Sequence, residues 1–196
     1  MEIFDMEQGE LDWFKVRVGV PSGSNFCKIV TSKGDPSKSA KEYMYRLVGE
    51  AVSGISEESY KSKSMQRGND LEEEARQLYE IINDVEVRQV GFCKEGQVGC
   101  SPDGLVSEDG MIEIKCLGNV AHVDILLKQE MPIKHFQQIQ GQLLVTGRKW
   151  CDFFSYSPGL KPFCKRIERD EVFLAKLKTE LKLFCLKLEE TIERIK

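Results

Sequence analysis

The pattern of apolar positions predicts helices in three stretches before the tail. Between Ser39 and Gly54 apolar residues lie three and four positions apart, and Ser39 with Glu42 has the spacing of a capping box. The same periodicity begins again after Gly68, where glutamates crowd the first turn, and a third time beyond Pro132. We therefore expect three helices in these places.

A fourth, longer helix is predicted from Asp170 onward. One stripe of this tail carries its apolar residues at helical spacing, namely Leu174, Leu177, Leu181, Phe184, Leu188, Ile192 and Ile195. Such a stripe could seed a coiled coil or pack on the core of its own domain. We favour packing on the core.

The period changes to two from Val85, where VEVRQVGF alternates. A second strand is predicted over 98–106, interrupted by a proline, and a hairpin turn over 107–110. Further strands are predicted over 111–116 and 150–156. Helices, then strands, then helix, strand and helix indicate a mixed sheet flanked by helices, in the α/β or α+β class. Because no linker-like stretch divides residues 1–196, we expect one domain.

Composition narrows the function classes. The net charge is −4 and the pI is near 5.4, so any DNA contact needs a local basic surface. The first ten residues are acidic and no apolar run approaches the roughly 18 residues of a membrane span, which predicts a cytoplasmic protein without membrane partners. The 7 cysteines form no CxxC pair, which predicts reduced, buried thiols. His122 and His135 are isolated, and we expect each to be at the surface or partly buried.

The chemistry is concentrated at Asp103 and, across the predicted hairpin, at Glu113, Ile114 and Lys115. Glu113 and Lys115 point to the same side of their strand because side chains alternate. Mg²⁺ prefers hard oxygen ligands, which two carboxylates and the Ile114 carbonyl supply, while Lys115 can orient a water or stabilise the transition state. This layout is that of the PD-(D/E)xK nucleases. The alternative is a turn cap beside a solvated strand face.

Flanking residues add candidates that each have an ordinary structural alternative. Glu72 borders the apolar stripe of its helix, and Gln138 and Gln140 could position a water or a phosphate, although an exposed glutamine-rich helix is the commoner case. Arg17 with Ser24 in a glycine-containing turn has the chemistry of phosphate capture, or is a surface turn.

Several blocks occur together and in order from Trp13 to about Arg194. They are WFKVRVG, GNDLEEEARQLYE, CSPDGL, IEIKC, FQQIQGQLLVTGRKW, YSP and IERDE. In order and approximate spacing they resemble the lambda exonuclease family of viral recombinases. The resemblance implies a restriction-endonuclease-like core.

The resemblance also implies roles for single residues. Asp103, Glu113 and Lys115 match the catalytic triad of the family, the first two as metal ligands together with the Ile114 carbonyl. Glu72 matches an additional carboxylate of the active site and Gln138 a glutamine beside it.

DNA-end contacts are implied in the same way. Arg17, Ser24 and Ser101 fall on positions that hold the 5′-phosphate, although VPSGS departs from the usual turn of the family around Ser24. Met65 aligns with an apolar wedge that separates the terminal base pair.

By resemblance, the activity is Mg²⁺-dependent 5′→3′ removal of nucleotides from 5′-phosphorylated double-stranded DNA ends, with Mn²⁺ able to substitute. The product is a 3′ single strand for an annealing recombinase, and relatives form a ring-shaped homotrimer. Candidate channel residues are Lys28, Lys33, Lys61, Lys63 and Arg67. The alternatives are a nicking or structure-specific endonuclease of the same superfamily and a catalytically silent DNA-binding subunit. An iron–sulfur nuclease fits less well, because Cys151, Cys164 and Cys185 are widely spaced.

Overall fold

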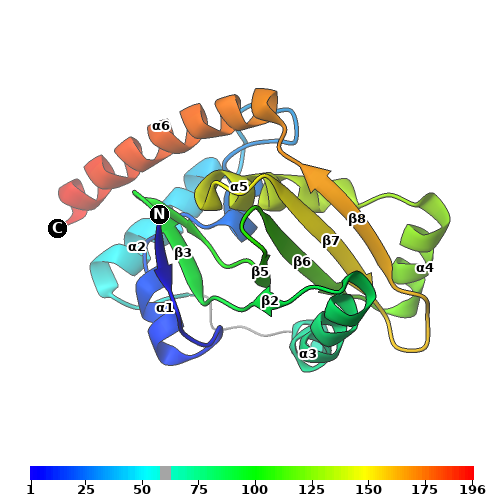
Figure 1. Cartoon of the computed structure of the whole chain (residues 1–196). Helices are drawn as coiled ribbons and strands as arrows, with labels where there is room; N and C mark the ends of the chain where they lie inside the picture. Colours follow the sequence, from blue (N-terminus) through cyan, green and yellow to red (C-terminus); the bar gives the residue numbers. More distant parts are fainter. Residues whose placement is uncertain (58–62) are drawn as a thin grey trace.

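Two β-sheets form the centre of the computed structural model, which describes residues 1–57 and 63–196, with side chains described for 1–57 and 71–196 (Figure 1). The small sheet has the order β1-β3-β4, with β1 at Glu2–Phe4, β3 at Phe92–Glu95 and β4 at Val98–Cys100. The large sheet has the order β2-β5-β6-β7-β8. Its strands are Val87–Arg88, Gly104–Val106, Gly110–Cys116, Trp150–Tyr156 and Phe163–Glu168.

The large sheet is mixed. Strand β5 pairs antiparallel with β6, and Val106 faces Gly110 across the hairpin. Strand β6 then runs parallel to β7, and β7 pairs antiparallel with β8. A mixed sheet flanked by helices was the predicted architecture, and it is confirmed.

Helices cover both faces of this sheet (Figure 1). Helix α5 packs on one face, with α6 and α2 beyond it, and α3 packs on the other. The α-helices are α1 Leu11–Arg17, α2 Ala40–Ser53, α3 Lys63–Asn83, α4 Asn119–Lys128, α5 Phe136–Thr146 and α6 Glu171–Ile195. Two 3₁₀ helices, η1 and η2, span Gly23–Lys28 and Ile133–His135.

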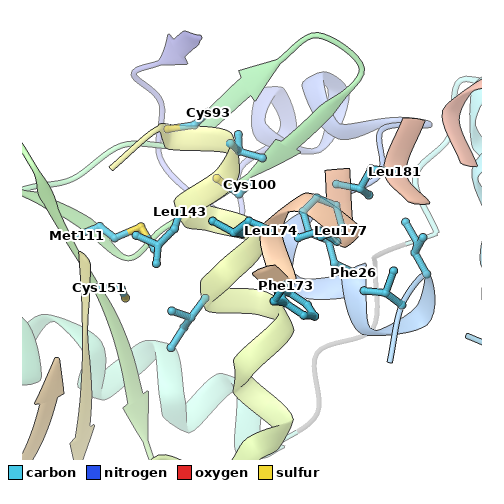
Figure 2. Close-up of a cluster of buried hydrophobic side chains, with 14 of the residues drawn as sticks. Phe26, Cys93, Cys100, Met111, Leu143, Cys151, Phe173, Leu174, Leu177 and Leu181 are labelled. Atoms are coloured by element: carbon cyan, nitrogen blue, oxygen red, sulfur yellow. The ribbon is translucent and has the colours of Figure 1, made fainter. Parts of the chain in front are cut away.

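Two apolar clusters follow from the alternation of β6. Met111 faces α5 and joins the larger cluster, where Leu143 of α5 meets Leu174 and Leu177 of α6 (Figure 2). Ile112 and Ile114 face the other way and join Ala75 and Tyr79 of α3 in the smaller cluster. The strand is thereby fixed from both sides, which fixes the direction of every side chain along it.

The predicted helices are largely confirmed, with corrections at their starts. Helix α2 ends at Gly54, which has φ 72°, as predicted for a left-handed C-cap. Its capping box is wrong, because Ser39 has helical backbone angles and its side chain caps nothing. Helix α3 begins at Lys63 and runs through Gly68, so the predicted start was also wrong. A glycine inside a helix costs about 1 kcal/mol, which packing of α3 on the sheet offsets.

The tail helix packs on the core as favoured. Asp170 caps its start by accepting a hydrogen bond from the Phe173 N–H at 2.9 Å. Five of the seven stripe residues are buried, from Leu174 to Leu188, whereas Ile195 is exposed. The stripe is therefore occupied within the chain for most of its length.

Strands β1, β3 and β8, helices α1 and α4 and both 3₁₀ helices were not predicted, and the strand predicted over 98–106 is two strands, β4 and β5, in different sheets. Strands β1 and β8 and helices α1 and α4 lack a clear apolar period; β8 is an edge strand with mostly exposed side chains, and α4 turns Val120 and Leu127 outward. His122 on α4 is fully buried between Ser155 and the Lys161 carbonyl, which corrects the expectation of a surface or partly buried residue, whereas His135 is partly buried.

Two remaining expectations from composition can be compared with the structure. All seven cysteines are reduced, but Cys27 and Cys164 are exposed and Cys116 is half-buried, so the prediction of buried thiols holds only in part. In the described part of the chain no helix has the length and apolar character to cross a bilayer.

Candidate active site

The β5–β6 hairpin brings Asp103 beside Glu113. Asp103 immediately precedes β5, and its Oδ2 accepts a hydrogen bond from the Ile114 N–H at 2.6 Å. Arg148 holds the turn from outside, because its Nη1 donates to the carbonyls of Val106, Ser107 and Gly110 at 3.2, 2.8 and 2.6 Å. The two carboxylates that are 10 positions apart in sequence are thus placed on adjoining backbone.

Glu113 is completely buried on the α5 side of β6, and three donors surround its carboxylate. Lys115 forms an ion pair with Oε1. Gln138 donates to the same oxygen at 2.6 Å, and Gln142 donates to Oε2 at 2.7 Å. The two glutamines are four residues apart, so one face of α5 presents both amides. Gln142 was not among the predicted site residues; its spacing from Gln138 was the available signal.

Electrostatics at this site are dominated by burial and by a surplus of carboxylates. Burial raises the pKa of Asp103 well above its usual range, and the charge of Glu113 raises it further. Burial also raises the pKa of Glu72, with Lys115 opposing the shift and Glu113 adding to it. For Lys115, burial lowers the pKa, but the carboxylates outweigh it and the net pKa is raised. The structure therefore places Glu72, Asp103, Glu113 and Lys115 in one electrostatic cluster.

The donor set fits a hard divalent cation. Among the side chains described, no group of three or more His, Cys, Asp or Glu residues is placed to hold a metal ion alone. Mg²⁺ does not require such a group, because it keeps several waters and takes one or two carboxylates plus substrate phosphate. Asp103 and Glu113 supply two carboxylates, and the Ile114 carbonyl is a further hard oxygen.

Arg17 and Ser101 meet next to this centre. Arg17 ends α1, is buried, and stacks its guanidinium 4.0 Å from the centroid of the Trp13 ring. Its Nη1 donates to the Ser101 hydroxyl at 3.3 Å, and that hydroxyl donates to the Gly91 carbonyl at 2.8 Å. A predicted pair 84 positions apart in sequence is thus in contact.

Ser24 lies on the neighbouring turn and is exposed. Its hydroxyl is 3.4 Å from the Ser22 hydroxyl and accepts from the Asn25 amide at 3.4 Å. A Cβ on Gly23 would stand 3.2 Å from Cys100 Cβ and 3.4 Å from Gln142 Cγ. The turn therefore packs against β4 and α5 at the same level as the glutamines that hold Glu113.

Other candidates are placed less fully. Gln140 is buried and joins α5 to the β8–α6 junction, away from Glu113, so the alternative of an exposed glutamine-rich helix is wrong. The predicted wedge Met65 and the channel candidates Lys63 and Arg67 have side chains outside the described residues, and Lys61 lies outside them entirely. Of the remaining channel candidates, Lys28 is half-buried and Lys33 is exposed.

His135 is a further neighbour that the sequence reasoning missed as a site residue. Burial, together with the charges of Lys115 and Lys134, lowers its pKa to about 4. Its ring centroid lies 5.4 Å from that of Phe153. A neutral imidazole thus stands near Lys115 at neutral pH.

Comparison with known proteins gives consistent matches. A family model described as the YqaJ-like viral recombinase domain matches residues 12–149. The alkaline exonuclease LHK-Exo from Laribacter hongkongensis is 34% identical over 95% of this chain and 96% of its own, with a TM-score of 0.86. LHK-Exo in complex with dAMP gives 35% identity at the same coverage and TM-score. A phage related exonuclease from Haemophilus somnus 129PT shares the fold, with a TM-score of 0.72 and 15% identity over 90% of this chain and 96% of that one. No curated protein matches the chain.

Proposed function

Since this chain belongs to the family of the YqaJ-like viral recombinase domain and is a nuclease, we propose that it is a Mg²⁺-dependent exonuclease for double-stranded DNA. It degrades the 5′-phosphorylated strand in the 5′→3′ direction and leaves a 3′ single strand. The observation that carries the proposal is the hairpin placement of Asp103 and Glu113, with Lys115 paired to Glu113. The similarity to an alkaline exonuclease over almost the whole chain supports it.

In this proposal each residue of the cluster has one task. Asp103, Glu113 and the Ile114 carbonyl hold the metal, and Mn²⁺ can replace Mg²⁺ because it accepts the same hard oxygens. A bound Mg²⁺ supplies positive charge against the phosphoryl oxygens and makes water a stronger nucleophile. Lys115 remains protonated, since its pKa is raised, and it stabilises negative charge on the phosphate or orients the attacking water.

Glu72 and Gln138 complete the proposed catalytic group. Glu72 carries a raised pKa, so it accepts a proton more readily than an exposed glutamate does and can serve the attacking water. Gln138 keeps Glu113 in place through its 2.6 Å hydrogen bond. These two tasks need no metal ligation by either side chain.

The choice of end is assigned to a second group. Arg17 and Ser101, already in contact, offer a guanidinium and a hydroxyl to a 5′-phosphate, and Ser24 offers another hydroxyl from the turn. Met65 remains the proposed wedge. A ring-shaped homotrimer that encircles DNA, and an annealing recombinase that takes the 3′ strand, complete the proposal as family expectations.

The test is digestion of linear duplex DNA labelled at either terminus, beside a closed circle, with Mg²⁺ and with EDTA. We expect Mg²⁺-dependent loss from 5′-phosphorylated ends, intact circles and a remaining 3′ single strand. Cutting of circles would instead assign an endonuclease, and no metal-dependent cutting would assign a silent DNA-binding subunit.

A further inference from the structure

Gln142 occupies a position between the two proposed sites. Its side chain is 1% exposed. Its Nε2 donates to Glu113 Oε2 at 2.7 Å and, over a longer distance of 3.4 Å, to the Ser101 carbonyl. One amide group therefore touches both the metal-binding carboxylate and the backbone of the residue that contacts Arg17.

The orientation of this amide is fixed by its neighbours. A glutamine amide has two N–H donors and one oxygen acceptor. Both neighbours, the Glu113 carboxylate and the Ser101 carbonyl, accept hydrogen bonds, so the nitrogen must face them. The Oε1 atom is then buried and has no hydrogen-bond donor among the described residues.

That arrangement is not what folding stability alone would favour. A buried oxygen without a donor loses its hydration without compensation, and an apolar side chain of the same length would avoid the loss. An amide at this position is explained by what its nitrogen holds.

Gln140 provides the contrast within the same helix. It is also 1% exposed, but its Nε2 donates to the Glu168 carbonyl at 2.8 Å and its Oε1 accepts from the Asp170 N–H at 2.9 Å. Both ends of its amide are satisfied by backbone at the start of α6. Gln140 therefore links α5 to the start of α6, whereas Gln142 contacts residues of the proposed site.

We propose that Gln142 is a positioning residue that holds Glu113 in its metal-binding orientation and sets the spacing between Glu113 and Ser101. It thereby couples metal binding to recognition of the 5′-phosphate, an inference that rests on the proposed function. The turn before Ser24 belongs to the same assembly, because Gly23 packs against the Gln142 side chain and admits no Cβ without displacement.

The experiment compares wild type with Gln142→Met, which keeps the length without donors, and Gln142→Asn, whose amide is one methylene too short. Gln140→Met is the matched control. Three quantities are measured: affinity for Mn²⁺ alone by calorimetry, the rate ratio between 5′-phosphorylated and 5′-hydroxyl ends, and the melting temperature.

Both Gln142 variants should bind Mn²⁺ about 10- to 100-fold more weakly, as is typical when a residue that orients a metal ligand is lost. Their preference for phosphorylated ends should also fall. Gln140→Met should lower the melting temperature while affinity and end preference stay at wild-type levels. If Gln142→Met fails to fold, Gln142→Asn carries the test.

The proposal is overturned if a folded Gln142 variant keeps wild-type Mn²⁺ affinity, or if Gln140→Met loses as much affinity. Failure of the proposed function shows differently: the wild-type protein itself would then bind no metal or leave linear DNA intact.

Discussion

The two halves of the proposed active site are built from different kinds of segment. The metal centre lies on paired strands, where Glu113 is fully buried and held by two amides at 2.6 and 2.7 Å. The phosphate site draws on the end of α1, the turn at Ser24 and the segment after β4, where Arg17 and Ser101 meet at 3.3 Å and Ser24 is exposed. The difference indicates that cleavage chemistry depends on the sheet, whereas end selection depends on connecting segments and can change separately.

Lys115→Ala should produce the largest effect. We expect the cleavage rate at saturating Mg²⁺ to fall by about 10²–10³-fold or more, since one charged group that stabilises the transition state is lost. Metal affinity should be retained, because the proposed ligands Asp103, Glu113 and the Ile114 carbonyl remain and the Lys115 ammonium no longer pairs with Glu113. Single-turnover cleavage measures the rate, and calorimetry with the metal measures the affinity. Full activity in this variant would exclude Lys115 from the mechanism.

Arg17→Met should have a smaller effect, on the other half of the site. The preference for 5′-phosphorylated over 5′-hydroxyl ends should fall about 10- to 100-fold, because a hydrogen bond to a charged group contributes about 1.5–3 kcal/mol. Rates on 5′-hydroxyl ends should hardly change. Ser24→Ala should lower the preference only a few-fold, since Ser24 is exposed and held by longer bonds. An unchanged preference in Arg17→Met would show that the 5′-phosphate binds elsewhere.

The same division explains how much of the site could be predicted from the sequence. Asp103 and Glu113 belong to one hairpin, so local alternation and a turn were enough to place them together. The contact between Arg17 and Ser101 joins residues 84 positions apart, and no spacing rule gives it; only the family resemblance suggested it. Gln142 and His135 were missed because burial and neighbours depend on how α5 seats on the sheet.

The fold shows the same limit. Strand β6 was predictable because both of its faces contact apolar clusters and its alternation is complete. Helix α4 was missed because Val120 and Leu127 point away from the core, so its apolar residues do not mark the buried face. The short strands β1 and β2 owe their pairing to neighbours distant in sequence, which a local pattern does not contain.

The smallest predicted effect is one on stability. Asp103→Asn should change the melting temperature in opposite directions with and without metal. The folded-state pKa of Asp103 is raised above its usual 3.8, first by burial and then by Glu113, with Lys115 opposing and Glu72 adding. The folded state therefore holds this proton more tightly, and wild-type stability falls as pH rises from 3.8 through the raised pKa. Asparagine has no such titration and still accepts from the Ile114 N–H. In EDTA at neutral pH the variant should melt higher, by about 2–4 °C for each 1 kcal/mol gained, and the gain should shrink as the pH falls toward 4.

Saturating Mg²⁺ should reverse that order, because a ligand that binds only the folded state stabilises wild type and the variant has lost a metal-binding oxygen. Melting curves between pH 4 and 8, with EDTA and with Mg²⁺, test this directly. Ser24→Ala is the control from the other half of the site, and its melting temperature should follow wild type in both conditions. A variant that melts lower than wild type in EDTA would mean that Asp103 holds the hairpin together more than it strains the site. In that case the contrast between a metal centre of crowded, buried carboxylates on paired strands and a phosphate site on connecting segments would no longer describe the molecule.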